Sequence, residues 1–357
     1  MTNAVQFQTA LNRVQPGETI ILAPGSYGNL TINHCGTGGQ PVFIAAENPA
    51  VTRLAMPEAG ERSGVGELAM NASNVTVCGL FFESGGFDST RHKTVRTDNI
   101  TYVQNYFNTG IKSFSDGVEN SIAIDKGGIN LTVQSNYFNA TRSPSFALDY
   151  GMLLYDLNGV TIRSNVFDGV FNRPISAKEN VSNALIEGNV FRGCGQACMQ
   201  LGQQPDYDEK DLTGDTVTVS DNNFIDAYTQ HPQSRYRLGI VLRNQQRIVV
   251  VNNNFNGMWT DVILTDFINR GGLARLQDRP LGSWGLKPLT ALIENNRFSD
   301  GSRLHFTGRG NGQWDKITVR GNTGSFTCRI EPWKEVEGKK YVLSTLNKNP
   351  PAVMGCP

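Results

Sequence analysis

The sequence predicts an all-β fold, a right-handed parallel β-helix in which each turn of a coil adds one strand to each of several parallel sheets. Three observations predict it. A short motif returns along most of the chain, each copy alternates apolar and polar residues, and each copy ends in a corner rich in Asn and Gly. Alternation with a period of two is typical of strands, and a motif that returns at regular intervals indicates stacked repeats.

The motif is clearest at residues 130–138, NLTVQSNYF, where Leu131 and Val133 supply the alternating apolar positions and Asn136 precedes the closing Phe138. The Phe of each copy predicts a stack of aromatic rings in the core. Its Asn predicts a corner ladder, because Asn tolerates left-handed backbone and its amide can hydrogen-bond to the next turn. The other copies, some of them weaker, lie at 74–82, 99–107, 159–167, 183–191, 216–224, 247–255, 291–298 and 316–324.

Helical repeats of similar length would need runs with a period of 3.6, and none occur between the copies. Because each turn of a coil packs only on its neighbours, 357 residues can form one domain. We therefore expect about nine or ten turns within residues 1–325. The longer spacings between copies predict inserted loops at 203–215, 229–237 and 267–288.

The two ends of the chain differ from the repeats. Phe7, Ala10, Leu11 and Val14 have helical spacing, which predicts a capping helix over residues 4–14 that covers the open end of the coil. Residues 326–357 form a tail that we expect to cap the coil or to lie along it. The first residues lack the basic-then-apolar pattern of a signal peptide, so either such a segment has been removed or the protein does not use that route.

Charge and hydropathy exclude some partners. Lys and Arg number 32 and Asp and Glu number 32, so no global charge favours nucleic acid or a membrane surface. No apolar run approaches the ~18 residues of a membrane-spanning helix.

Six cysteines are present, and their spacing makes two disulfides plausible, Cys194–Cys198 and Cys328–Cys356. The alternative is that they are small buried residues. The chain has four His, none at ligand spacing to a Cys, so we expect no metal site of the zinc type.

A second strand follows each corner, and aligning these strands defines a candidate site. Alternation directs one residue of each strand into the core: Ile124, Leu154, Ala177, Leu201, Leu242, Leu264 and Phe306. The next residue of each strand then faces outward: Asp125, Tyr155, Lys178, Gly202, Arg243, Thr265 and Thr307. A second outward row lies two residues earlier: Ala123, Leu153, Ser176, Gln200, Val241, Ile263 and His305. Since neighbouring turns are about 4.8 Å apart, two turns span roughly the length of one or two sugar rings.

The inserted loops add side chains suited to an anionic sugar chain. We expect them to wall a groove along the coil. Arginine pairs with carboxylates and tryptophan stacks on sugar rings. The predicted substrate-binding residues are Gln200, Arg235, Arg237, Arg270, Arg275, Trp284 and His305. The acidic loop 203–215 is compatible with Ca²⁺, although a solvated loop is the simpler interpretation.

β-Elimination on a uronic acid polysaccharide would use this site. The reaction needs a base for the C5 proton and a cation that neutralises the carboxylate. Lys178 is the candidate base, Tyr155 or Lys126 the proton donor and Arg243 the cation. Asp125 lies on the same row and completes the candidate catalytic set.

Residues 15–49, QPGETIILAPGSYGNLTINHCGTGGQPVFIAAENP, together with the short helix before them, resemble the opening turns of polysaccharide lyase family 6. That family includes alginate lyases and chondroitinase B, and the likeness covers about the first 80 residues. The resemblance implies a Lys base, which the segment RPISAKEN places at Lys178. The family's Arg one turn later has no counterpart in MQLGQ, and Arg173 and Pro174 stand where the family has acidic calcium ligands.

Two other functions stay open. The first is a non-catalytic receptor-binding spike of a phage or phage-like particle, a homotrimer that binds capsular polysaccharide outside the cell without cutting it. The second is a glycoside hydrolase, which needs two carboxylates roughly 5–10 Å apart. Its candidates are Asp125, Asp156 and Glu179, although alternation gives the last two an inward parity unless the chain turns there.

Overall fold

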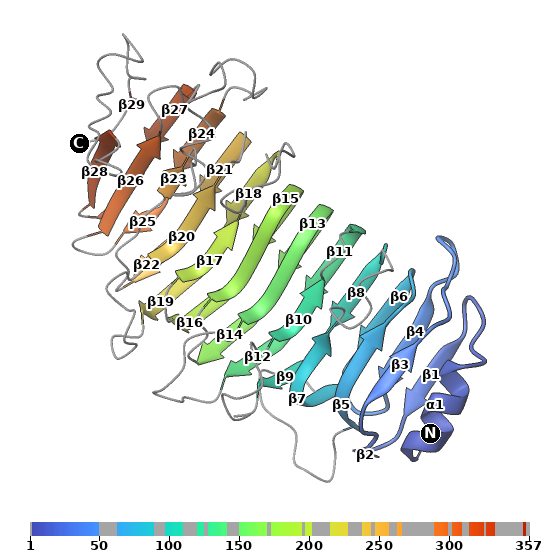
Figure 1. The fold of residues 1–357 in the computed structure, drawn as a ribbon. Helices are drawn as coiled ribbons and strands as arrows, with labels where there is room; N and C mark the ends of the chain where they lie inside the picture. The colour runs from blue at the N-terminus through green and yellow to red at the C-terminus, as the bar shows by residue number, and fades with distance from the viewer. Residues whose placement is uncertain are drawn as a thin grey trace, which may run out of the picture.

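A computed structural model shows the chain as one elongated coil of parallel strands (Figure 1). The structure describes residues 2–49, 63–88, 97–109, 120–124, 128–140, 150–169, 173–194, 197–201, 215–227, 238–243, 247–256, 263–265, 289–298, 302–308, 314–324, 326–332 and 353–354. The predicted fold class is confirmed, because every pairing between the named strands is parallel and links one turn to the next.

The first face of the coil is built from the repeated motif. It contains β1 (Thr19–Leu22), β4 (Val42–Ala46), β6 (Val75–Cys78), β8 (Ile100–Val103), β11 (Gly128–Gln134), β13 (Tyr150–Arg163), β15 (Arg173–Glu187), β18 (Val217–Ser220), β21 (Arg247–Val251), β24 (Leu289–Glu294), β27 (Trp314–Arg320) and β29 (Val353–Met354). The nine copies of the motif correspond to the nine strands from β6 to β27. β1 and β4 extend this face before the copies, and β29 extends it after them.

The second face follows the Asn corner. Its strands are β2 (Gly25–Ser26), β5 (Ser63–Met70), β7 (Phe81–Asp88), β9 (Tyr106–Thr109), β12 (Tyr137–Ala140), β14 (Val166–Gly169), β16 (Val190–Cys194), β19 (Asn223–Ala227), β22 (Asn254–Asn256) and β25 (Arg297–Phe298). The third face contains β3 (Leu30–Ile32), the ends of β5 and β7, β10 (Asn120–Ile124), the beginnings of β13 and β15, β17 (Ala197–Leu201), β20 (Leu238–Arg243), β23 (Ile263–Thr265), β26 (Ser302–Gly308) and β28 (Phe326–Pro332).

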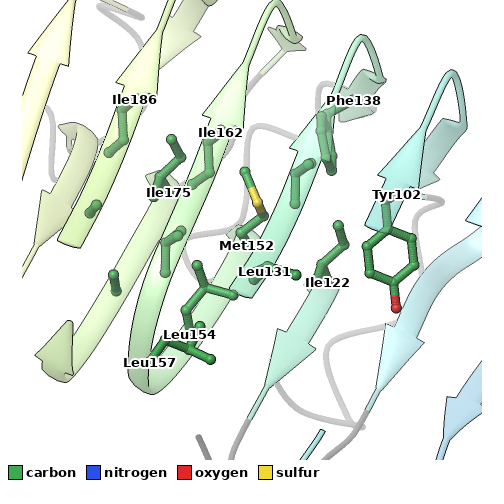
Figure 2. Close-up of a cluster of buried hydrophobic side chains, with 14 of the residues drawn as sticks. Tyr102, Ile122, Leu131, Phe138, Met152, Leu154, Leu157, Ile162, Ile175 and Ile186 are labelled. Carbon is green, nitrogen blue, oxygen red and sulfur yellow. The ribbon is translucent and has the colours of Figure 1, made fainter. Parts of the chain in front are cut away.

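The three faces enclose one apolar core. Figure 2 shows part of it, with Leu131 and Ile162 from the first face and Met152 and Leu154 from the third. The predicted Phe stack is confirmed along the second face. Its rings follow one another at centroid distances between 4.6 and 5.1 Å from Phe82 to Phe298. Such stacked pairs contribute about 0.5–1.5 kcal/mol each beyond the area that they bury.

The predicted Asn ladder is also confirmed. The Asn165 side chain donates to Oδ1 of Asn189 at 2.9 Å and to the carbonyl of Val133 at 2.9 Å, and the backbone N–H of Asn165 also donates to that Oδ1. The same pattern continues through Asn222 and Asn253. Each corner therefore supplies partners for the buried amide of the corner before it.

The helix α1 (Ala4–Leu11) covers the first turn, as predicted, and ends earlier than residue 14 (Figure 1). The Asn3 side chain caps it by accepting a hydrogen bond from the Gln6 N–H. Phe7 and Leu11 are fully buried, and Phe7 packs edge-on against Tyr27. In the described part of the chain, no helix is long and apolar enough to cross a membrane.

The predicted Cys194–Cys198 disulfide is present, and both residues lie in the core. Cys35 and Cys78 are free thiols. Cys328 belongs to β28, but its side chain and Cys356 lie outside the described residues, so the second disulfide stays a prediction.

Candidate functional site

The alignment of the second strands is confirmed on the third face. Leu154 lies opposite Ile124 on one side and Ala177 on the other, and the row continues through Leu201 and Leu242. Leu264 and Phe306 complete it. The four from Leu154 to Leu242 are at most 1% exposed, so this row faces the core as alternation requires.

The next row holds the predicted catalytic residues. Tyr155 of β13 lies directly opposite Lys178 of β15, and Arg243 of β20 lies opposite Thr265 of β23. Lys178 and Arg243 are separated by two steps of the sheet, about 10 Å between backbones. The Tyr155 side chain is half-buried. The side chains of Lys178 and Arg243, and the whole of Asp125, lie outside the described residues.

The other outward row is aligned as predicted but is buried, contrary to the expectation that it faces solvent. Leu153, Ser176, Gln200 and Val241 follow one another on four consecutive turns and are 8%, 0%, 4% and 2% exposed. They stand on the side of the sheet opposite the core. This row is therefore buried in this structure, whereas on β13 Tyr155 is half-buried and Asp156, at the end of the third-face part of the strand, is exposed.

Ser176 is the polar residue at the centre of that buried row. Its Oγ is buried and has no hydrogen-bond partner among the described residues. A buried hydroxyl without a partner is uncommon in proteins.

The remaining predicted binding residues stay predictions. Arg235, Arg237, Arg270, Arg275 and Trp284 lie outside the described residues. His305 lies opposite Arg329 in the pairing of β26 with β28, and its side chain lies outside the described residues. Gln200 is placed on the third face, as predicted, in the buried row.

For Asp156 the structure decides between the two alternatives left open for the hydrolase carboxylates, inward parity and a turn of the chain. Alternation would direct it inward, like Leu154, but it is exposed. The chain turns there. Asp156 has a φ of +48°, and the register shifts so that Tyr155 still pairs with Lys178 whereas Leu157 pairs with Val181. One residue of β13 thus stands opposite two residues of β15, which is a β-bulge.

This corner joins the third face to the first within a single strand. In β13 the connection is Asp156 alone, whereas β17 and β18 are separated by residues 202–216. No inserted loop therefore interrupts the chain beside Tyr155. A residue that tolerates left-handed backbone, followed by the apolar Leu157, was the signal for this turn in the sequence.

Calcium does not fit the strand on which the resemblance would place it. Arg173 begins β15, and burial lowers the pKa of its guanidinium, with an opposing effect from Tyr150. A guanidinium supplies no oxygen to Ca²⁺. The described residues contain no group of three or more His, Cys, Asp or Glu side chains that could hold a metal ion.

Comparison with known proteins gives structural matches only. No family model matches the chain, and no curated protein does either. Among solved structures, the chain is similar to a mutant of the PL6 family alginate lyase AlyGC, with a TM-score of 0.46 and 15% identity over 95% of this chain. This chain spans about half of that protein, 49% of its length.

Two further matches are weaker. One is a mannuronic acid specific polysaccharide family 6 lyase from human gut microbiota, with a TM-score of 0.39 and 12% identity, covering 92% of this chain and 83% of that one. The other is an alginate lyase from Paenibacillus sp. str. FPU-7, also at 0.39 and 12%, covering 93% and 96%. These values are too low to bear on activity. The fold itself rests on the parallel strand pairing.

Proposed function

We propose that the protein binds an anionic polysaccharide along the corner between its third and first faces and cleaves it by β-elimination. The observation that carries the proposal is the pairing of Tyr155 with Lys178 at a strand end beside the exposed Asp156. A tyrosine and a lysine on neighbouring turns offer a proton donor and a base about 5 Å apart in backbone position.

Each of three residues, Lys178, Tyr155 and Arg243, would carry out one step of this reaction. The Lys178 amine takes the proton from C5 of a uronate residue, and the electron pair forms a C4–C5 double bond while the C4–O bond breaks. Tyr155 protonates the departing oxygen. Arg243, two turns away, neutralises the uronate carboxylate in the transition state, where such stabilisation accelerates the reaction most.

The sugar would approach at the strand ends. The row that contains Ser176 and Gln200 is buried, which leaves Tyr155 and Asp156 as the accessible described residues of this corner. The step of about 4.8 Å between turns is close to the length of one sugar ring, so a chain that runs along the coil meets one turn per sugar. An extracellular setting, where such polysaccharides occur, belongs to the same proposal.

The test is a comparison of Lys178→Ala with Lys316→Ala on alginate, pectate and capsular uronate polysaccharides. Lys316 lies on β27, towards the C-terminal end of the coil and several turns away from β15. We expect the wild type to generate the ultraviolet absorbance of an unsaturated uronate. Lys178→Ala should lose at least about 100-fold of this rate and keep its affinity, since a general base acts in the transition state. Lys316→Ala should behave as wild type.

The alternatives give different results. Binding without any new absorbance, unchanged in Lys178→Ala, would contradict the lyase and favour the non-catalytic spike, as would a stable trimer in sedimentation. New reducing ends without unsaturated products would instead indicate a hydrolase.

A further inference from the structure

In the described residues, left-handed backbone recurs at two places of the coil, and Asp156 lies at neither. Twelve non-glycine residues of the described chain have a positive φ. Five stand directly before the first buried apolar residue of the repeated motif, two of them within β11 and β15: Asn74, Asn99, Asn130, Asn183 and Thr216. Six follow strands of the first face, directly before the Asn ladder: Gln104, Ser135, Ser164, Asp221, Asn252 and Asn295. Asp156 belongs to neither set.

A periodic left-handed residue is explained by the corner that every turn repeats. Asp156 stands at neither repeated place, and the neighbouring strand β15, whose connection is also described, has no positive φ between Lys178 and Val181. A residue held in a sparsely populated conformation, outside any repeat, is a reason to look for a function at that place. β-Bulges are likewise frequent next to active sites, where they redirect side chains.

The kink and the bulge lie at the candidate catalytic pair. Tyr155 directly precedes Asp156, and the register shift falls between Tyr155 and Leu157, immediately after the pairing of Tyr155 with Lys178. Without the bulge, the strand ends of β13 and β15 would continue in register, and the residues after Tyr155 and Lys178 would alternate into the core. The bulge makes these two residues the last regular pair of the third face.

We propose that Asp156 is a positioning residue: its left-handed backbone ends the third face at the Tyr155–Lys178 pair and fixes how these two residues stand relative to each other. The role belongs to the backbone of Asp156, not to its carboxylate. For its kinetic readout this inference rests on the proposed function.

Three substitutions separate the backbone from the carboxylate. Asp156→Gly and Asp156→Asn remove the charge, and both residues accept left-handed backbone. Asp156→Val also removes the charge, but a β-branched residue is a true outlier at positive φ. The matched control is Ser164→Val. Ser164 directly follows β13, has a φ of +55°, and is exposed like Asp156.

We expect Asp156→Gly and Asp156→Asn to retain the turnover of wild type. Asp156→Val should lower kcat by about 100-fold, because a misplacement of about 1 Å in a catalytic pair has an effect of this size. Ser164→Val should lose a similar amount of thermal stability and keep its kcat. Loss of turnover in all three Asp156 variants would assign the role to the carboxylate and overturn the proposal. Wild-type turnover in Asp156→Val would overturn it as well.

A second readout does not depend on lyase activity. The acylation rate of the Lys178 amine, followed by mass spectrometry, reports the surroundings of that side chain directly. This rate should change in Asp156→Val and stay that of wild type in Ser164→Val and Asp156→Asn. If the wild type cleaves no polysaccharide but the acylation rate changes as described, the proposed function fails and the positioning role stands. An unchanged acylation rate in Asp156→Val would contradict the positioning role.

Discussion

The two corners that flank each first-face strand are built in opposite ways. The corner after the strand repeats the same parts from turn to turn: a left-handed residue, a buried Asn and a core Phe. The corner before the strand differs from turn to turn and ranges from the single residue Asp156 to the long segment 266–288. A coil needs one constant corner to set its step, which leaves the other free to vary. The candidate site lies at the variable corner.

The sharpest test of this contrast is the removal of one amide from the constant corner. Asn189→Ala deletes both side-chain donors of Asn189 and the acceptor for Asn165, and leaves the buried N–H of Asn165 without its partner. Each unsatisfied buried group costs about 1–3 kcal/mol. We expect the free energy of unfolding to fall by about 3–5 kcal/mol in denaturant titration.

Asn322→Ala is the control for this prediction. Asn322 is the last Asn of the ladder in the described residues and is half-buried, so water can replace part of what the variant loses. Its effect should be clearly smaller. Equal losses in the two variants would show that the ladder does not act through buried partners.

An intermediate effect is expected for the aromatic stack. Phe224→Leu keeps most of the buried apolar volume but removes two stacked contacts, those with Phe191 and Phe255 at 4.9 and 4.6 Å. We expect the free energy of unfolding to fall by about 1–3 kcal/mol. Phe224→Tyr would keep both ring contacts. If Phe224→Leu had no effect on thermal unfolding, stacking would not contribute to the constant corner beyond apolar volume.

The smallest effect is expected at the variable corner. Asp215 precedes β18, and Arg247 at the start of β21 forms an ion pair with it. The hydrogen bond from Arg247 holds the pKa of Asp215 below its usual range. The pair therefore stabilises the fold above the ordinary carboxyl pKa, and this contribution is lost as the pH falls through the lowered value.

Arg247→Ala should change the unfolding midpoint little at neutral pH, because the Arg247 side chain is exposed, that of Asp215 is half-buried, and solvent screens the pair. The measurement is the unfolding midpoint from pH 7 down to pH 2 for wild type and variant. The two curves should converge at the acid end. A large loss at pH 7 would mean that the variable corner also supports the scaffold.

Much of the fold could be predicted because each copy of the motif carries the residues that determine the structure of its own turn. The alternation around Leu131 and Val133 determines which face is buried, and Asn136 and Phe138 mark where the chain turns. The alignment of Leu154 with Ala177 and Leu201 follows from the same parity and is observed. Parity alone could not place Asp156, because it assumes that a strand continues, and a bulge interrupts the alternation there.

What the sequence by itself determined is the step of the coil, its core rows and the pairing of Tyr155 with Lys178. These depend on contacts between identical positions of neighbouring turns, which a repeat makes visible. Only the tertiary structure decided that Leu153, Ser176, Gln200 and Val241 are buried, since alternation within a strand does not show whether its outer row is covered. It also decided that the chain kinks at Asp156, because backbone conformation at a single position outside the repeat leaves no periodic trace.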